Sequence, residues 1–89
     1  MNLEDFLASK LRIKILKVLI DVGELNVSNI AKRVKANYQA VDKHLKILES
    51  ENIVKHKVFG RIRLYRVNYS PKAEALKKLI EVWEQKRKT

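Results

Sequence analysis

The chain has 89 residues, of which 46% are apolar, so it is expected to form one small domain with a modest core. It carries 20 lysines and arginines against 10 acidic residues and no cysteine, which excludes disulfides and thiolate metal sites. It has no apolar run long enough to span a membrane, and its acidic start, with Glu4 and Asp5, does not resemble a secretory signal. These features predict an intracellular protein without a membrane partner.

The positive charge is concentrated in the middle of the chain. Residues 1–30 carry four basic and four acidic side chains, whereas residues 31–70 carry ten and three, and residues 71–89 carry six and three. A concentrated cationic surface indicates a nucleic-acid partner. The plainer alternative is a solvated basic face that only improves solubility.

Two helices are predicted for the first quarter of the chain. Residues 2–8 can form a short amphipathic helix, and Ser9 can cap a second helix over residues 10–22. Apolar residues recur at helical spacing in the second helix, at Leu11, Ile15, Leu16, Leu19 and Val22. Gly23 suits the end of this helix, and a short extended piece is expected at residues 24–25.

Two further helices, joined by a three-residue turn, are predicted next. Asn26 is expected to cap a helix over residues 27–34, and Asn37 to cap one over residues 38–50. The side chains expected to face inward are Ile30, Ala31, Val34, Val41, Leu45 and Leu48. Asn52 can adopt the left-handed conformation that ends the second of these helices.

The apolar pattern then changes from helical to strand spacing. Residues 53–59 and 61–68 are rich in valine, isoleucine, phenylalanine and tyrosine and meet at Gly60, which predicts a β-hairpin. Ser70 and Pro71 are typical of a helix start, and the helix is predicted to run to about residue 86. Its apolar stripe consists of Ala73, Leu76, Ile80 and Trp83, with Leu79 beside it.

This order of elements predicts a winged helix-turn-helix, an α+β, mainly α fold with a β-hairpin wing and a C-terminal dimerisation helix. We expect a single DNA-binding domain over residues 1–89, with residues 9–67 as the winged-helix core. Residues 2–8 and 71–87 lie outside that core and carry apolar surface, so we predict that they join two chains in a homodimer. The residues predicted to make this contact are Leu3, Phe6, Leu7, Leu76, Leu79, Ile80 and Trp83. In the alternative, Trp83 packs inside its own monomer.

The helix over residues 38–50 is the predicted recognition helix, which would enter the major groove of DNA. Gln39 is the first candidate for reading a base, because its amide can donate and accept together on adenine. Tyr38 can contact a thymine methyl or a phosphate, and Lys43 and Lys46 can contact phosphate or guanine. The predicted DNA-binding residues of this segment are Asn37, Tyr38, Gln39, Asp42, Lys43 and Lys46. The alternative is a solvated helix surface.

The predicted hairpin is a second cationic element. Its predicted DNA-binding residues are Lys55, Lys57, Arg61 and Arg63, on backbone or in a narrow minor groove. Arg61 and Arg63 share a strand parity and flank the turn, so they are the first candidates. Arg66 lies nearer the core and is expected to be structural or to contact a helix. The alternative is an edge hairpin that positive charge protects from aggregation.

A family resemblance is carried by residues 11–16, 23–31 and 41–48, together with Gly60 and Tyr65 of the hairpin. These stretches resemble the winged-helix repressors of the ArsR, or arsenical-resistance, type. The resemblance covers residues 9–67 and implies a DNA-binding transcriptional regulator. The abundance of lysine, glutamate and isoleucine, with few glycines and prolines, is a bias reported for hyperthermophile proteins. An archaeal source is predicted.

The chain departs from this family at its sensor and recognition positions. Metal-sensing members carry cysteines in the segment that here spans residues 24–28, where Asn26 and Ser28 supply no thiolate. We therefore predict no metal and no cofactor. Asp42 stands where the family usually has serine, and its carboxylate would repel a phosphate or accept from a cytosine amine. His44 belongs to the family signature, and its place beside Leu45 favours packing or capping over ligation.

The sequence shows no catalytic constellation. His44 and His56 lie in different elements, Glu49 and Glu51 project differently, and two glycines make no phosphate-binding loop. The prediction is a non-enzymatic, cytoplasmic and nucleoid-associated homodimer that binds a specific sequence of double-stranded DNA as a transcriptional regulator. One alternative is an architectural or chromatin protein with little sequence specificity, and another is a module that binds protein or RNA.

Overall fold

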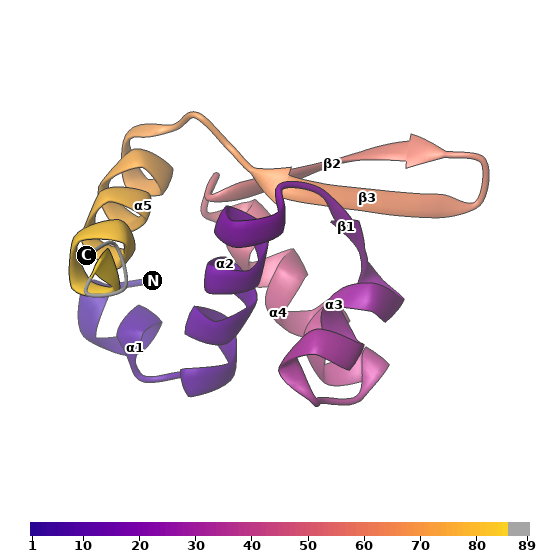
Figure 1. The fold of residues 1–89 in the computed structure, drawn as a ribbon, viewed down its shortest axis with the longest axis horizontal. Helices are drawn as coiled ribbons and strands as arrows, with labels where there is room; N and C mark the ends of the chain where they lie inside the picture. Colours follow the sequence, from indigo (N-terminus) through magenta and orange to yellow (C-terminus); the bar gives the residue numbers. More distant parts are fainter. Residues whose placement is uncertain (86–89) are drawn as a thin grey trace.

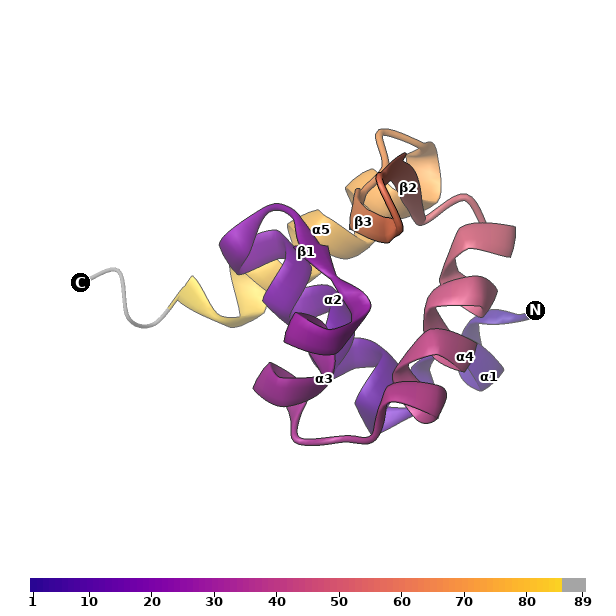
Figure 2. The same cartoon turned by 90° about the vertical axis from the view of Figure 1, so that its right-hand side faces the viewer.

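The structure, a computed structural model, describes residues 1–85 of the chain. Its elements are α1 (Leu3–Leu7), α2 (Lys10–Val22), β1 (Leu25–Asn26), α3 (Val27–Val34), α4 (Tyr38–Ser50), β2 (Val54–Phe59), β3 (Ile62–Val67) and α5 (Pro71–Trp83). Figure 1 shows the β2–β3 hairpin projecting from a helical body, with α1 and α5 at the opposite end. In the 90° view of Figure 2, α4 lies on one side of the body and α3 on the other. Among the described helices, none has the length and apolar character needed to cross a membrane.

The helix boundaries follow from capping residues that the sequence displays. Side-chain oxygens of Ser9, Asn26, Asn37 and Ser70 each accept a hydrogen bond from the backbone amide three residues later, at the start of α2, α3, α4 and α5. Pro71 occupies the first turn of α5, and Asn52, which follows α4, has a φ of 64°. These caps, and the two helices α3 and α4 of the helix-turn-helix, confirm the predictions. Helix α5 ends at Trp83 rather than near residue 86, and the predicted dimerisation positions 86–87 lie outside the described residues.

The core is built around α2, which contacts α1, α3, α4 and β3. Its fully buried side chains include Ile15, Leu16, Leu19, Ile30, Val41, Leu45, Leu48, Ile53, Val54 and Tyr65. Val22, predicted to face inward, is 40% exposed because it is the last residue of α2, next to the solvent-exposed Gly23. The sequence also gave no sign that Arg12 is buried on this helix, with only 6% of it exposed.

The strands form a three-stranded antiparallel sheet in the order β1-β3-β2. The extended piece predicted at residues 24–25 is shifted by one residue, and Leu25 of β1 pairs with Tyr65 of β3. Phe59 and Ile62 pair across a two-residue turn, where Gly60 has a φ of 65° at the first position. A positive φ at this position is typical of type II′ hairpin turns, which explains the glycine.

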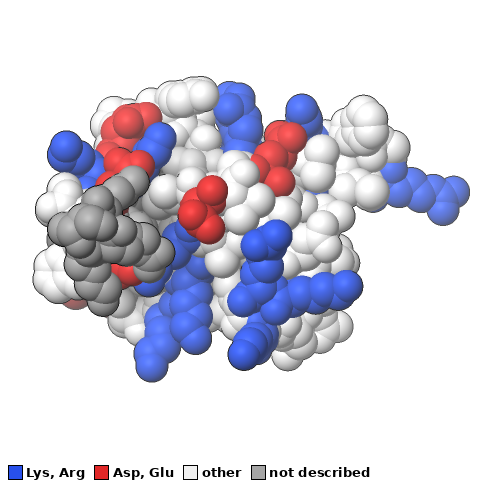
Figure 3. All heavy atoms as spheres, viewed as in Figure 1, with Lys and Arg blue, Asp and Glu red and all other residues white. Residues whose placement is uncertain are grey.

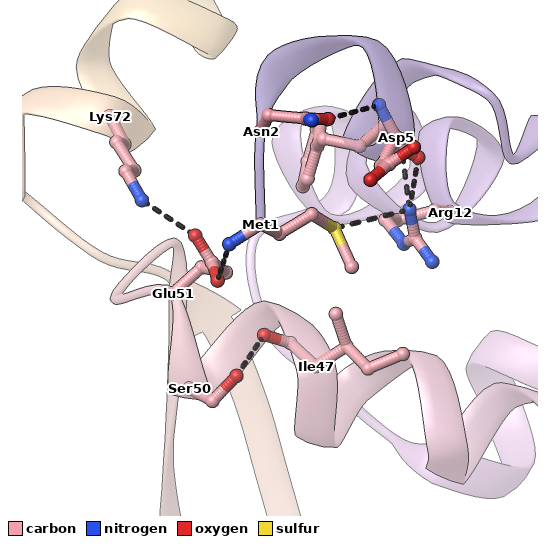
Figure 4. Close-up of polar contacts among 9 residues, drawn as sticks. Met1, Asn2, Asp5, Arg12, Ile47, Ser50, Glu51 and Lys72 are labelled. Atoms are coloured by element: carbon pink, nitrogen blue, oxygen red, sulfur yellow. Dashed lines mark hydrogen bonds and ion pairs between the residues drawn. The ribbon is translucent and has the colours of Figure 1, made fainter.

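Polar contacts of Arg12 and Glu51 hold the N-terminal segment and the start of α5 on the body (Figure 4). The Arg12 Nη1 donates to the carbonyl oxygens of Asp5 and Phe6, at 3.2 and 2.9 Å, in the last turn of α1. Glu51, after α4, accepts from the Lys72 Nζ of α5 at 2.6 Å and from the amino group of Met1 at 3.3 Å. The hydrogen bond from Lys72, then that from Met1, lowers the pKa of the Glu51 carboxyl.

The prediction that Phe6 makes a dimer contact is wrong, because the side chain is buried in its own chain and only 5% of Phe6 is exposed. Its ring packs in the core of its own chain, with the Arg12 guanidinium 5.5 Å from the ring centre. Leu3 and Leu7, on the same helix, are 65% and 43% exposed. Only these two apolar side chains of α1 therefore remain for an external contact.

Candidate nucleic-acid interface

Helix α4 has a fully buried face and an exposed polar face. Val41, Leu45 and Leu48 are buried, which turns Gln39 and Lys43 outward. A shallow hollow of about 470 Å³ follows the outward face and is lined by Tyr38, Gln39, Asp42, Lys43, Lys46, Ile47 and Ser50. The structure thus brings the predicted residues of α4 onto one surface. Asn37 lies at its start, where its side-chain oxygen accepts from the Ala40 amide at 2.8 Å.

Asp42 is an ion-pair partner of the hairpin rather than a free carboxylate. The Arg63 Nη2 donates to Asp42 at 2.7 Å, and the Lys46 Nζ lies 3.2 Å from the other carboxylate oxygen. Burial alone would raise the pKa of Asp42, but the hydrogen bonds from Arg63 and Lys46 outweigh it and lower that pKa. The negative charge that the sequence placed in the interface is therefore neutralised within the protein.

Arg63, predicted with Arg61 as a first candidate for DNA contact, is engaged within the protein, whereas Arg61 is exposed. The Arg63 Nη1 donates to the Tyr65 hydroxyl at 2.8 Å, and its Nη2 lies 3.5 Å from the Tyr38 hydroxyl as well as near Asp42. These bonds, with that to Asp42 as the largest cause, raise the pKa of Arg63. Strand register explains the difference, because Arg63 and Tyr65 share the sheet face toward α4, whereas Arg61 lies in the turn.

A second link joins α4 to the hairpin and was missed at the sequence level. His56 Nδ1 lies 2.6 Å from the Glu49 Oε2, and the His56 ring is 5.0 Å from that of Tyr65. Glu49 follows Asp42 by seven residues, which places both carboxylates on one side of the helix. That spacing, opposite His56 and Arg63 on one face of the paired strands, is the signal that could have revealed the link.

The other cations of the hairpin lie on its opposite face or at its end. Lys57 reaches Glu24 at 3.6 Å, while its side chain stays 63% exposed. The Lys55 Nζ and the Arg66 guanidinium lie 5.8 and 5.4 Å from the Tyr69 ring centre. Arg66 thus has the structural contact that its position suggested. Arg61 is exposed in the turn.

The positive surface charge is concentrated on two parts of the molecule. Figure 3 shows lysine and arginine side chains projecting along the lower edge of the body and at the far end of the hairpin. From Val54 to Val67 the sequence has five lysines and arginines and no acidic residue. The charged side chains of this segment are therefore all positive, although Asp42 and Glu24 pair with two of them.

His44 and the acidic residues do not form a metal centre. In residues 1–85, no three histidine, cysteine or acidic side chains are grouped in a way that could hold a metal ion. Burial, then the charges of Arg12 and Lys43, lowers the pKa of His44, which favours the neutral ring. This half-buried ring fits the packing role expected of it.

The comparisons with known proteins agree with this geometry. The family model described as "Bacterial regulatory protein, arsR family" matches residues 9–56, from the cap of α2 to the first half of β2. No curated protein matches the chain.

Solved structures with the same fold include three regulators. The homodimeric winged helix-turn-helix DNA-binding domain of a possible ArsR-family transcriptional regulator from Mycobacterium bovis is 26% identical, with a TM-score of 0.75 over 94% of this chain and 76% of that one. HlyU from Vibrio cholerae is 24% identical, with a TM-score of 0.79 over 94% and 89% of the two chains. The transcriptional repressor BigR from Xylella fastidiosa is 17% identical, with a TM-score of 0.81 over 99% and 85%.

The family model spans more than half of the chain, and its members regulate transcription rather than catalyse reactions, in agreement with the prediction of a non-enzyme. The described fold contains the helix-turn-helix and the hairpin wing of the solved regulators. This chain belongs to the arsR family of regulatory proteins.

Proposed function

We propose that this DNA-binding regulator recognises a specific sequence of double-stranded DNA as a homodimer. In this proposal α4 enters the major groove and the β2–β3 hairpin lies on the flanking backbone or minor groove. The observation that carries the proposal is the outward face of α4, where an exposed amide and two exposed lysines surround a shallow hollow. An α-helix fits the major groove, and its N-terminal side chains reach the base edges.

Gln39 has the role of base reader in this proposal. It lies in the first turn of α4, is exposed, and makes no hydrogen bond to another described side chain. Lys43 is also exposed one turn later, and Lys46 keeps 65% of its side chain exposed while contacting Asp42. Tyr38, the first residue of α4, extends toward the hairpin, with its hydroxyl 3.5 Å from the Arg63 Nη2. The amide therefore supplies sequence information, and the lysines supply attraction to phosphate.

Exposed apolar side chains on α1 and α5 support a homodimer. Trp83 is 77% exposed, which contradicts the alternative that it packs inside its own monomer. The other large apolar side chains exposed on these helices are Leu3 (65%), Leu7 (43%), Leu79 (47%) and Val82 (50%). Both helices also border an apolar groove of about 270 Å³, lined by Leu3 and Leu79 among others. The M. bovis relative is a homodimer, and two copies here would bury this surface away from the hairpin (Figure 1).

Selection of bound duplexes from a random DNA pool, followed by affinity measurements at physiological salt, tests the proposal. We expect a near-palindromic site with half-sites roughly 34–36 Å apart, one turn of DNA. The selected duplex should bind at least about 10³-fold more tightly than random duplexes. Equal affinity for both would favour the architectural alternative, which the net charge of +10 also suits.

A further inference from the structure

The end of the hairpin carries three large apolar side chains in solvent. We define the wing tip as residues 58–62, in which Val58, Phe59 and Ile62 are 66%, 71% and 45% exposed. Phe59 and Ile62 pair across the Gly60 turn and therefore share one face of the hairpin. A tip that served only to place charge near phosphates would not need these side chains.

The wing tip extends beyond the part of the hairpin that is fixed to the body. On one face Arg63 is held by Asp42 at 2.7 Å, and on the other Lys57 lies 3.6 Å from Glu24. Figure 1 shows the strands continuing past these elements into solvent. The anchored base can thus hold the tip at a defined position relative to α4 while leaving its apolar side chains available.

The positive charge around the wing tip indicates which class of partner the tip can bind. The hairpin from Val54 to Val67 contains no acidic residue, and Arg61 lies between Phe59 and Ile62. Repulsion between such hairpins disfavours contact with a second copy of this chain at the same tip. Double-stranded DNA combines a polyanionic exterior with an apolar base stack, so it satisfies both features of the tip.

We propose that the wing tip is a minor-groove wedge, in which Phe59, supported by Ile62, inserts between two base pairs and bends the DNA. Arg61 would hold the adjacent phosphates or the groove floor while the ring opens the stack. Apolar side chains inserted in this way kink DNA by about 20–90° toward the major groove. Pyrimidine–purine steps unstack most easily, so such a step is expected beneath the tip. This inference rests on the proposed DNA binding.

The test uses the full chain and the duplex selected from the random pool. Dyes on the two DNA ends report bending by energy transfer, and 2-aminopurine placed at each flanking pyrimidine–purine step reports unstacking. Fluorescence anisotropy measures affinity separately. We expect the wild-type protein to bend the duplex and to raise the 2-aminopurine signal at one symmetric pair of steps. Phe59→Ala should abolish both signals and weaken affinity by about tenfold or less, because the cost of unstacking disappears with the wedge.

Two variants make the comparison specific. Phe59→Leu keeps an apolar wedge and should retain most of the bend. Tyr69→Ala removes another aromatic side chain that is also 71% exposed, away from the tip, and should leave the bend unchanged. Thermal unfolding of each variant checks that the exposed positions leave the fold intact.

Each contrary result has a distinct meaning. Unchanged bending by Phe59→Ala, or tight binding by the wild type without bending or unstacking, overturns the wedge and leaves the proposed function standing. Loss of self-association in Phe59→Ala without DNA would identify the tip as a protein contact and also overturn it. Failure of the wild type to bind any duplex in the pool overturns both proposals.

Discussion

Helices α4 and α5 have the same length, 13 residues, yet they leave opposite kinds of surface exposed. Helix α4 buries Val41, Leu45 and Leu48 and leaves Gln39 and Lys43 outside, whereas α5 buries only Ala73 fully and leaves Trp83 outside. A helix whose apolar face is covered by the core of its own chain can present its polar face to DNA. A helix whose apolar side chains stay exposed has surface available for a second copy of the chain. The comparison therefore supports the proposed division of roles, with DNA recognition by α4 and assembly through α5.

Trp83→Ala is the change with the largest expected effect. Removal of the most exposed apolar side chain of α5 should dissociate the dimer at micromolar concentration. Because two linked recognition helices gain avidity of about 10²–10⁴-fold, affinity for the palindromic site should fall within that range. Sedimentation measures the dimer, and anisotropy measures the DNA complex.

Lys78→Ala is the matched control for Trp83→Ala, since Lys78 is another exposed residue of α5. It should leave sedimentation unchanged. A wild-type protein that sediments as a monomer at these concentrations would contradict the assignment of α5 to assembly.

Gln39→Ala tests the other helix and should cost roughly 1–3 kcal/mol on the selected site. It should cost much less on random duplexes, because the amide contributes a base contact and little electrostatic attraction. Lys43→Ala, one turn later on the same face, should instead weaken binding to all duplexes alike. Anisotropy titrations of both variants with both duplexes give the comparison. An equal loss on every duplex for Gln39→Ala would remove base reading from this residue.

The ion pair between Asp42 and Arg63 should have a smaller, measurable effect on the free energy of unfolding. Both side chains are partly buried, 19% and 30% exposed, and lie 2.7 Å apart. A double-mutant cycle with Asp42→Ala and Arg63→Ala should give a coupling free energy of about 1 kcal/mol by chemical denaturation. The same cycle with Lys46, whose side chain is 65% exposed, should give at most about 0.5 kcal/mol. Equal coupling free energies for the Asp42–Arg63 and Asp42–Lys46 pairs would mean that Asp42 does not hold the hairpin against α4.

Much of this structure was predictable because the decisive signals are local. The caps at Ser9, Asn37 and Ser70 fix helix starts through contacts within four residues, and Gly60 fixes the hairpin turn. Helical spacing alone identified the buried face of α4. The helices and the hairpin were therefore predicted close to their observed boundaries.

The features that sequence reasoning missed depend on contacts between distant segments. Arg12 is buried because α1 folds back and offers it two carbonyl oxygens, a contact that the periodicity of α2 does not encode. Phe6 became part of the core for the same reason. Arg63 and Asp42, 21 residues apart, meet only because β3 passes α4 in this register. Each of these residues was interpreted from the helix or strand that contains it. Its role, however, depends on a contact with a different element.

The salt dependence of DNA binding should distinguish Arg61 from Arg63. Arg61 is exposed in the turn, so Arg61→Ala should lower the slope of log affinity against log salt by about 0.9 if one phosphate contact is lost. Arg63 is engaged by Asp42, and Arg63→Ala should change that slope much less while lowering stability. Titrations at several salt concentrations give both slopes. Equal slope changes would show that Arg63 leaves Asp42 to contact DNA.

The smallest expected effect is that of metal ions, which should leave DNA affinity unchanged. Thiolate sensing at the β1–α3 junction needs cysteine, and here the Asn26 side chain instead accepts a hydrogen bond from the Asn29 amide at 2.8 Å. His56 lies 2.6 Å from Glu49, and His44 is held half-buried with a lowered pKa, so the two imidazoles belong to separate contacts. Zinc, cadmium or arsenite should therefore leave the anisotropy titration of the selected duplex unaltered, with and without a chelator. A tight, stoichiometric shift in affinity would contradict this prediction and would require ligands from a second chain, because a structural zinc site generally needs four ligands.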